Sequence, residues 1–142
     1  MKILTDGLRF PEGPVAMPDG SIALVEIEAQ RITSVAPDGS KSTIADVPGG
    51  PNGLALGPDG LFFLCNNGGF AFTENDGYLR PSGQATDYET GRIETVDPRT
   101  GDIKRLYDRV GEHRLKGPND LMFDGQEGFW FSDLGKSRPR DR

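Results

Sequence analysis

The feature of this sequence that most constrains its fold is a phrase that recurs three times. Each copy has a proline-containing turn, a short apolar run, a glycine-centred turn and a second apolar run, and the copies span residues 10–26, 50–66 and 117–133. The first two copies begin about 40 residues apart, a spacing typical of the four-stranded blades of β-propellers. Because such repeats bury their faces only against neighbouring repeats, the whole chain is predicted to form part of one larger domain.

The pattern of apolar runs and turns predicts an all-β fold, an incomplete propeller of about two and a half four-stranded antiparallel blades. Expected strands of the first blade lie near residues 14–17, 21–26, 31–36 and 40–45. Those of the second blade lie near residues 54–57, 61–65, 92–96 and 102–107. The blades are predicted to cover about residues 10–46, 51–108 and 117–142. Asp-Gly dipeptides between apolar runs, such as Asp19-Gly20, support the hairpins.

Composition narrows the class of protein. The 142 residues carry a formal net charge of −6, and the absence of a Lys/Arg cluster argues against nucleic-acid partners. No apolar run is long enough to span a membrane, and the N-terminus lacks the apolar core of a signal peptide. Cys65 has no second cysteine to pair with, so a reducing, cytoplasmic location is expected. The basic stretch 136–142 is interpreted as a solvated loop.

Three oxygen-bearing side chains occupy the same register position of the repeat, just before the first predicted strand of each copy. They are Glu12, Asn52 and Asn119. Carboxylate and amide oxygens are ligands of hard cations such as Ca²⁺, and no Cys/His cluster suggests a zinc site. The alternative interpretation is that these residues cap local turns, and it is strongest for Asn52, which precedes a glycine.

The connectivity of an up-and-down blade places two long segments on the same face as these three residues. One is the loop at about residues 66–91, which starts with Asn66, and the other is the link at about residues 108–118, which carries the only histidine, His113. Long loops on one rim are commonly functional. Asn52, Asn66 and His113 are therefore candidate substrate-binding residues, although a lone loop histidine is more often simply solvated.

Several motifs together resemble the SMP-30/gluconolactonase/luciferin-regenerating-like family, and in particular the N-terminal half of a bacterial lactonase-like member. They are Arg-Phe-Pro-Glu-Gly-Pro at residues 9–14, Leu-Cys-Asn-Asn-Gly-Gly-Phe at 64–70, Gly-Pro-Asn-Asp-Leu-Met-Phe-Asp at 117–124 and Gly-Phe-Trp-Phe-Ser-Asp at 128–133. The resemblance implies a six-bladed propeller around a divalent metal, commonly calcium. Glu12 matches the metal-binding glutamate of the first blade, and Asn119 matches an asparagine at the metal or the adjoining substrate position. Asn52 has no firm counterpart.

The resemblance further implies metal-dependent hydrolysis of a sugar lactone or similar cyclic ester. The cofactor would be a divalent metal, Ca²⁺ first, with Zn²⁺ or Mn²⁺ as alternatives, and the general base is expected beyond residue 142. Residues 1–142 alone are therefore predicted to be inactive. The alternatives are a binding or assembly module that self-associates through its open blade edge, and a truncated half-propeller without function.

Overall fold

A computed structural model describes residues 2–126 and 128–136, and it contains β-strands and no helix in these residues. The first sheet is antiparallel and runs in chain order through β1 (Pro11–Ala16), β2 (Ile22–Glu26), β3 (Arg31–Val35) and β4 (Lys41–Asp46). The second sheet has the order β5 (Pro51–Leu56), β6 (Phe62–Asn66), β9 (Arg92–Val96) and β10 (Ile103–Tyr107). The third repeat forms the hairpin of β13 (Pro118–Phe123) and β14 (Phe129–Asp133). The predicted all-β fold is confirmed, and the described residues include no helix that could span a membrane.

Two further hairpins interrupt the repeat. β7 (Phe70–Asn75) and β8 (Tyr78–Gln84) lie between β6 and β9, and β11 (Arg109–Val110) and β12 (His113–Arg114) lie between β10 and β13. The segment expected as a long loop at 66–91 thus contains a β-hairpin. At its tip Asp76 and Gly77 have φ of 53° and 77°, as a two-residue type I′ turn requires. The Asp-Gly signal for this turn was present in the sequence.

The first strands of the first two repeats begin about three residues earlier than the sequence indicated. β1, β5 and β13 start at Pro11, Pro51 and Pro118. Each then contains a β-bulge, in which three residues of the strand span the same length as two residues of its partner strand. Proline is tolerated as the first residue of a strand, where its missing N–H breaks no ladder. The Gly- and Pro-rich sequence that indicated a turn is instead accommodated by the bulge.

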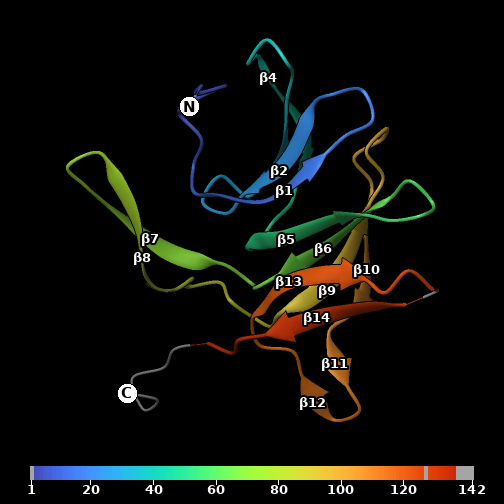
Figure 1. Cartoon of the computed structure of the whole chain (residues 1–142). Helices are drawn as coiled ribbons and strands as arrows, with labels where there is room; N and C mark the ends of the chain where they lie inside the picture. Colours follow the sequence, from blue (N-terminus) through green and yellow to red (C-terminus); the bar gives the residue numbers. More distant parts are fainter. Residues whose placement is uncertain (1, 127, 137–142) are drawn as a thin grey trace.

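The three first strands lie side by side, one from each repeat, and they begin at the same end of the molecule (Figure 1). We call this end, marked by Pro11, Pro51 and Pro118, the inner rim. Two glycines let these strands approach closely. A Cβ on Gly13 would lie 2.7 Å from the carbonyl oxygen of Asn52, and a Cβ on Gly53 would lie 2.6 Å from the Cα of Asp120.

Two apolar clusters join the repeats, and β6 contributes to both because successive side chains point to opposite faces of a sheet. Phe62 and Leu64 are fully buried against the first sheet, whereas Cys65 is buried towards the β13–β14 hairpin. On that side, Phe63 contacts the rings of Phe123 and Phe129 with centroids 5.0 and 5.4 Å apart.

The outer face of the β13–β14 hairpin remains uncovered. Met122 and Trp130 form a cross-strand pair there and are 68% and 74% exposed. Large apolar side chains exposed together commonly mark a surface that another element covers.

We predict that Gly53→Ala destabilises the chain by at least about 2 kcal/mol, because the added methyl group collides with backbone atoms of β13 that cannot move independently. Gly83→Ala is the matched control, since a Cβ at Gly83 meets no atom within 4 Å. Urea denaturation followed by tryptophan fluorescence measures both variants. Equal midpoints for the two would contradict the close packing of β5 on β13.

Candidate functional site

The three residues aligned by the repeat occupy equivalent places in the structure. Glu12, Asn52 and Asn119 are each the second residue of a first strand, at the start of its bulge. They therefore lie within β1, β5 and β13. The sequence had placed them just before these strands. Since these strands are neighbours, one polar residue from each repeat stands at the inner rim.

The structure brings two of these side chains into direct contact. Asn52 Nδ2 donates a hydrogen bond to Asn119 Oδ1 over 3.0 Å, although the residues are 67 positions apart. Glu12 stands on the neighbouring strand, where Gly13 abuts the backbone of Asn52, and its side chain is exposed. An amide pair and an exposed carboxylate thus stand on neighbouring strands at the same edge of the molecule.

A polar residue at the end of each second strand ties down the segment that leads into the first strand. Glu26 accepts a hydrogen bond from the backbone N–H of Arg9 at 2.6 Å. Asn66 accepts one from Gly50 at 2.8 Å. Asp133 accepts two, from Lys116 at 2.8 Å and from Gly117 at 2.7 Å. These three side chains fix where the inner rim begins.

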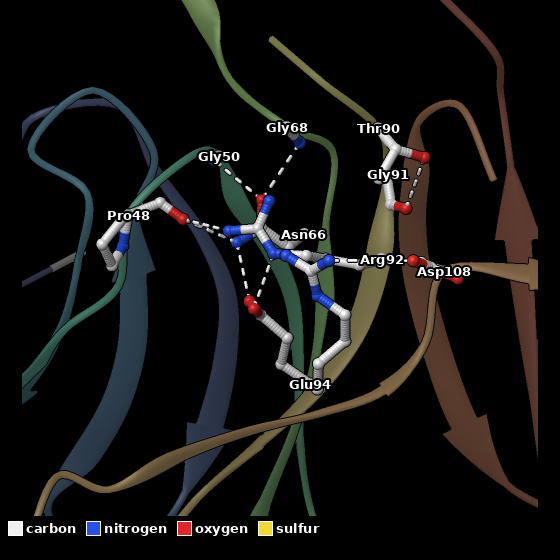
Figure 2. A network of polar contacts seen from close by, with 10 residues as sticks. Pro48, Gly50, Asn66, Gly68, Thr90, Gly91, Arg92, Glu94 and Asp108 are labelled. Atoms are coloured by element: carbon white, nitrogen blue, oxygen red, sulfur yellow. Dashed lines mark hydrogen bonds and ion pairs between the residues drawn. The ribbon is translucent and has the colours of Figure 1, made fainter. Parts of the chain in front are cut away.

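Asn66, a candidate substrate-binding residue from the sequence, is fully buried, and its amide is saturated by protein groups (Figure 2). Its oxygen accepts from the N–H groups of Gly50 and Gly68, and its nitrogen donates to the carbonyl oxygen of Pro48 and to Glu94. Burial of the whole second strand end, which the local sequence does not reveal, turns this residue inward.

Arg92 completes the network around Asn66. Its Nε lies 2.6 Å from Glu94 Oε1, and its Nη2 donates to the carbonyl oxygen of Pro48. Both side chains are largely buried. The loop 48–50 that leads into β5 is therefore held by an amide and a guanidinium together (Figure 2).

In the first repeat, Glu26 forms the corresponding polar network with other residues. Burial alone would raise the pKa of Glu26, but hydrogen bonds from Arg31, Thr33 and the Arg9 N–H outweigh it and hold that pKa below its usual value. Burial likewise opposes ionisation of Asp133, whose pKa is nevertheless lowered by hydrogen bonds from the N–H groups of Lys116, Gly117 and Gly135. Glu26 and Asp133 therefore hold these backbone N–H groups most strongly when their side chains are ionised.

The β7–β8 hairpin stands at the inner rim, as the connectivity of the blade predicts. Phe72 packs on Phe10 with ring centroids 5.2 Å apart, and Glu74 lies 3.2 Å from Arg9 Nη1. Arg9 and Phe10 immediately precede β1, so the hairpin leans on the beginning of the first repeat. Figure 1 shows it projecting from the side at which β5 begins.

Sequence reasoning missed Lys136, which had been assigned to a solvated loop. It follows β14 and reaches back across the rim, where its Nζ donates to the carbonyl oxygen of Gly69 at 2.7 Å and to Asn67 Oδ1 at 3.2 Å. Its partners are distant in sequence, so no local signal identifies them. The rest of that basic stretch, 137–142, lies outside the described residues.

His113 lies in β12 and is exposed. The β11–β12 hairpin projects at the lower edge of Figure 1, away from the beginnings of β1 and β5.

The side-chain oxygens of Glu12, Asn52 and Asn119 are of the chemical type that hard cations prefer, because all are carboxylate or amide oxygens. Asn119 Oδ1 already accepts one hydrogen bond, and an amide oxygen has a second lone pair for a cation. Among the described residues no group of three or more His, Cys, Asp or Glu side chains could hold a metal. Glu12 and Asn119 are the residues of the aligned set that could contribute oxygens to a cation site.

Glu26→Gln should reduce stability at pH 7 by about 1–3 kcal/mol, because its amide nitrogen would face a donor, either Arg31 or the Arg9 N–H. The pKa of Glu26 is lower in the folded state, so its contribution is fully present above the unfolded value and is lost as the pH falls below that value and through the lower pKa of the folded state.

The variant should accordingly lose stability less steeply than the parent between about pH 5 and 3. Glu112→Gln, at an exposed position, is the control. Urea midpoints at several pH values test this, and parallel pH profiles for Glu26→Gln and the parent would refute it.

Comparison with known proteins gives one family match. Residues 10–142 match the model of the SMP-30/Gluconolactonase/LRE-like region. No curated protein matches the chain.

Solved structures share the fold. A gluconolactonase from Xanthomonas campestris is 21% identical with a TM-score of 0.69, and the match covers 92% of this chain and 37% of that protein. A protein provisionally named a gluconolactonase is 21% identical with a TM-score of 0.68, over 97% and 45% of the two chains. A Bacteroides thetaiotaomicron protein of unknown function is 15% identical with a TM-score of 0.59, over 84% and 32%. The chain spans less than half the length of these proteins, and the incomplete propeller predicted from the sequence is confirmed.

Proposed function

Because the chain belongs to the SMP-30/gluconolactonase/LRE-like family, we propose that it supplies the first blades of a divalent-metal-dependent hydrolase of sugar lactones or similar cyclic esters. The observation that carries the proposal is the Asn52–Asn119 hydrogen bond. It joins polar side chains of two repeats beside the exposed carboxylate of Glu12, at the edge where all three first strands begin. Polar groups that converge from separate elements are typical of a binding site.

Glu12 and Asn119 are the proposed metal ligands. Glu12 provides the negative charge, and Asn119 provides an amide oxygen whose direction is set by the hydrogen bond from Asn52. An all-oxygen donor set favours Ca²⁺, with Zn²⁺ or Mn²⁺ as alternatives. A bound divalent cation polarises an ester carbonyl and lowers the pKa of bound water.

Asn52 is the proposed substrate-binding residue at this rim. Its Nδ2 is directed at Asn119, which leaves its amide oxygen to accept a hydroxyl group of a sugar lactone. The β7–β8 hairpin, packed on Phe10, forms a wall on the same side. We assign Asn66 a structural role, because protein groups saturate its amide, and we leave His113 outside the site.

A general base is still required. Among the described residues, Glu12 is the carboxylate of the aligned set, and a metal ligand is poorly suited to remove a proton as well. We propose that the base comes from further blades, since the proteins that share this fold are more than twice as long.

We expect residues 1–142 alone to show little or no turnover of an aldonolactone with Ca²⁺, Zn²⁺ or Mn²⁺, because calcium affinity depends on the number of charged ligands and on rigidity. A longer protein that continues this chain through further blades should be active. There Glu12→Gln should lower kcat/KM by about a hundredfold or more. Titration of released acid at constant pH measures turnover.

Glu112→Gln is the matched control in the longer protein, because it removes an equal charge from an exposed turn. Turnover by the 142-residue monomer that is lost on Glu12→Gln would show that these blades complete the site in another way. The exposed Met122–Trp130 face favours self-association as the alternative role. A stable dimer in light scattering, without turnover by the longer protein, would favour that alternative.

A further inference from the structure

The β7–β8 hairpin and the segment that leads into β1 form an open pocket of about 350 Å³ between them. Residues 7–11 line one side, and the other side is lined by Glu74, Gly77, Tyr78 and Leu79. A volume of this size is within the range of small-molecule sites and holds a six-membered ring with its substituents. Pro11 is among the lining residues and directly precedes Glu12, so the pocket adjoins the inner rim.

An unusual backbone conformation shapes this pocket. Phe10 has a φ of 58°, in the left-handed region that bulky residues rarely adopt. In an extended segment, successive side chains point to opposite sides. Here Arg9 and Phe10 both reach one face of β7, because their partners Glu74 and Phe72 are two residues apart on that strand. Backbone strain of this kind persists only where the surroundings fix it, and it is concentrated at functional sites such as ligand clamps.

The guanidinium group of Arg9 is fixed in this pocket and retains unused hydrogen-bond donors. Its Nε and Nη2 donate to the two carboxylate oxygens of Glu28 at 2.8 and 2.7 Å, and its Nη1 lies 3.2 Å from Glu74 Oε2. A guanidinium group has five N–H groups, so two remain for a ligand. Among the described residues only Arg9 donates to Glu74, whose side chain is 53% exposed. Free donors and a free acceptor thus stand side by side in the pocket.

The charges in the pocket decide which class of ligand fits. Arg9 and Glu74 carry opposite charges 3.2 Å apart, so a ligand with a single charge would be attracted by one group and repelled by the other. An apolar ligand would remove water from both groups without replacing its hydrogen bonds. A hydroxyl group both donates and accepts, so a neutral polyol satisfies both groups. Its C–H groups would pack on Leu8 and Leu79, which are half-buried on opposite sides of the pocket.

We propose that this pocket is a binding subsite for a neutral, polyhydroxylated six-membered ring, and that Arg9 and Glu74 hydrogen-bond to its hydroxyl groups. That the ring belongs to a sugar lactone rests on the proposed function. The β7–β8 hairpin then determines specificity, since it supplies Glu74 and Leu79. A ring of the same size without hydroxyl groups is rejected, because it would desolvate the Arg9–Glu74 pair without forming hydrogen bonds to it.

The test uses the folded 142-residue chain without added metal. Backbone amide resonances of Gly7 and Gly77, which line opposite sides of the pocket, are followed by NMR while 1,5-anhydro-D-glucitol is added. This compound is a polyhydroxylated six-membered ring that contains no ester. We expect both resonances to shift and to saturate at roughly millimolar concentration, while Gly125 in the β13–β14 turn does not respond. Tetrahydropyran, the same ring without hydroxyl groups, and the anion D-gluconate should each bind at least about fivefold more weakly.

Two variants extend the test, each with a matched control. Leu79→Trp fills the pocket and should abolish the shifts, whereas Ile103→Trp adds the same bulk at an exposed position of β10 and should leave them unchanged. Glu74→Ala removes the acceptor and should weaken binding at least about fivefold. Glu112→Ala, at an exposed position outside the pocket, should not.

Four results would overturn the inference: no saturable shift, equal shifts with tetrahydropyran, tighter binding of D-gluconate, or shifts that persist in Leu79→Trp. Binding of the polyol to the 142-residue chain, without turnover of lactone by the longer protein, would support the inference and count against the proposed function. Turnover by the longer protein without binding in this pocket would do the reverse.

Discussion

The structure depends on the polar side chain that closes each second strand. The first strand of every repeat starts with a proline, which cannot donate a hydrogen bond, so the incoming segment must be fixed by other groups. Glu26, Asn66 and Asp133 accept its backbone N–H groups instead. Because these bonds determine where β1, β5 and β13 begin, they also determine where Glu12, Asn52 and Asn119 stand.

The first two repeats form this polar network with a buried carboxylate in each, but the carboxylate is on a different strand in each repeat. In the first, the carboxylate is on the second strand and Thr33 faces it from the third. In the second, the amide of Asn66 is on the second strand and the carboxylate of Glu94 is on the third. Each of these two repeats thus pairs one buried carboxylate with one arginine, Arg31 or Arg92. Two carboxylates on adjacent strands would repel each other in a buried place, which the exchange avoids.

The sequence predicted what the repeat encodes and missed what depends on contacts between repeats. Periodicity of the apolar runs located eight strands of the first two sheets, and alignment of the copies identified Glu12, Asn52 and Asn119. The hydrogen bond between the two asparagines joins residues 67 positions apart, and the contacts of Lys136 with Asn67 span 69 positions. Such pairs have no local signature. The β7–β8 turn did have one, at Asp76-Gly77, but the length of the segment suggested an irregular loop.

We propose that side chains from separate repeats hold a divalent cation at the inner rim. The decisive experiment follows the side-chain amide resonances of Asn52 and Asn119 by NMR while Ca²⁺ is added to the folded chain. One carboxylate and one amide should bind Ca²⁺ at roughly millimolar concentration, and the Asn52 amide should respond through its hydrogen bond to Asn119. We predict that both resonances shift together, that the exposed Asn75 does not respond, and that Glu12→Gln removes the shifts. Resonances that do not move, or that move equally in Glu12→Gln, would show that these residues do not hold the cation.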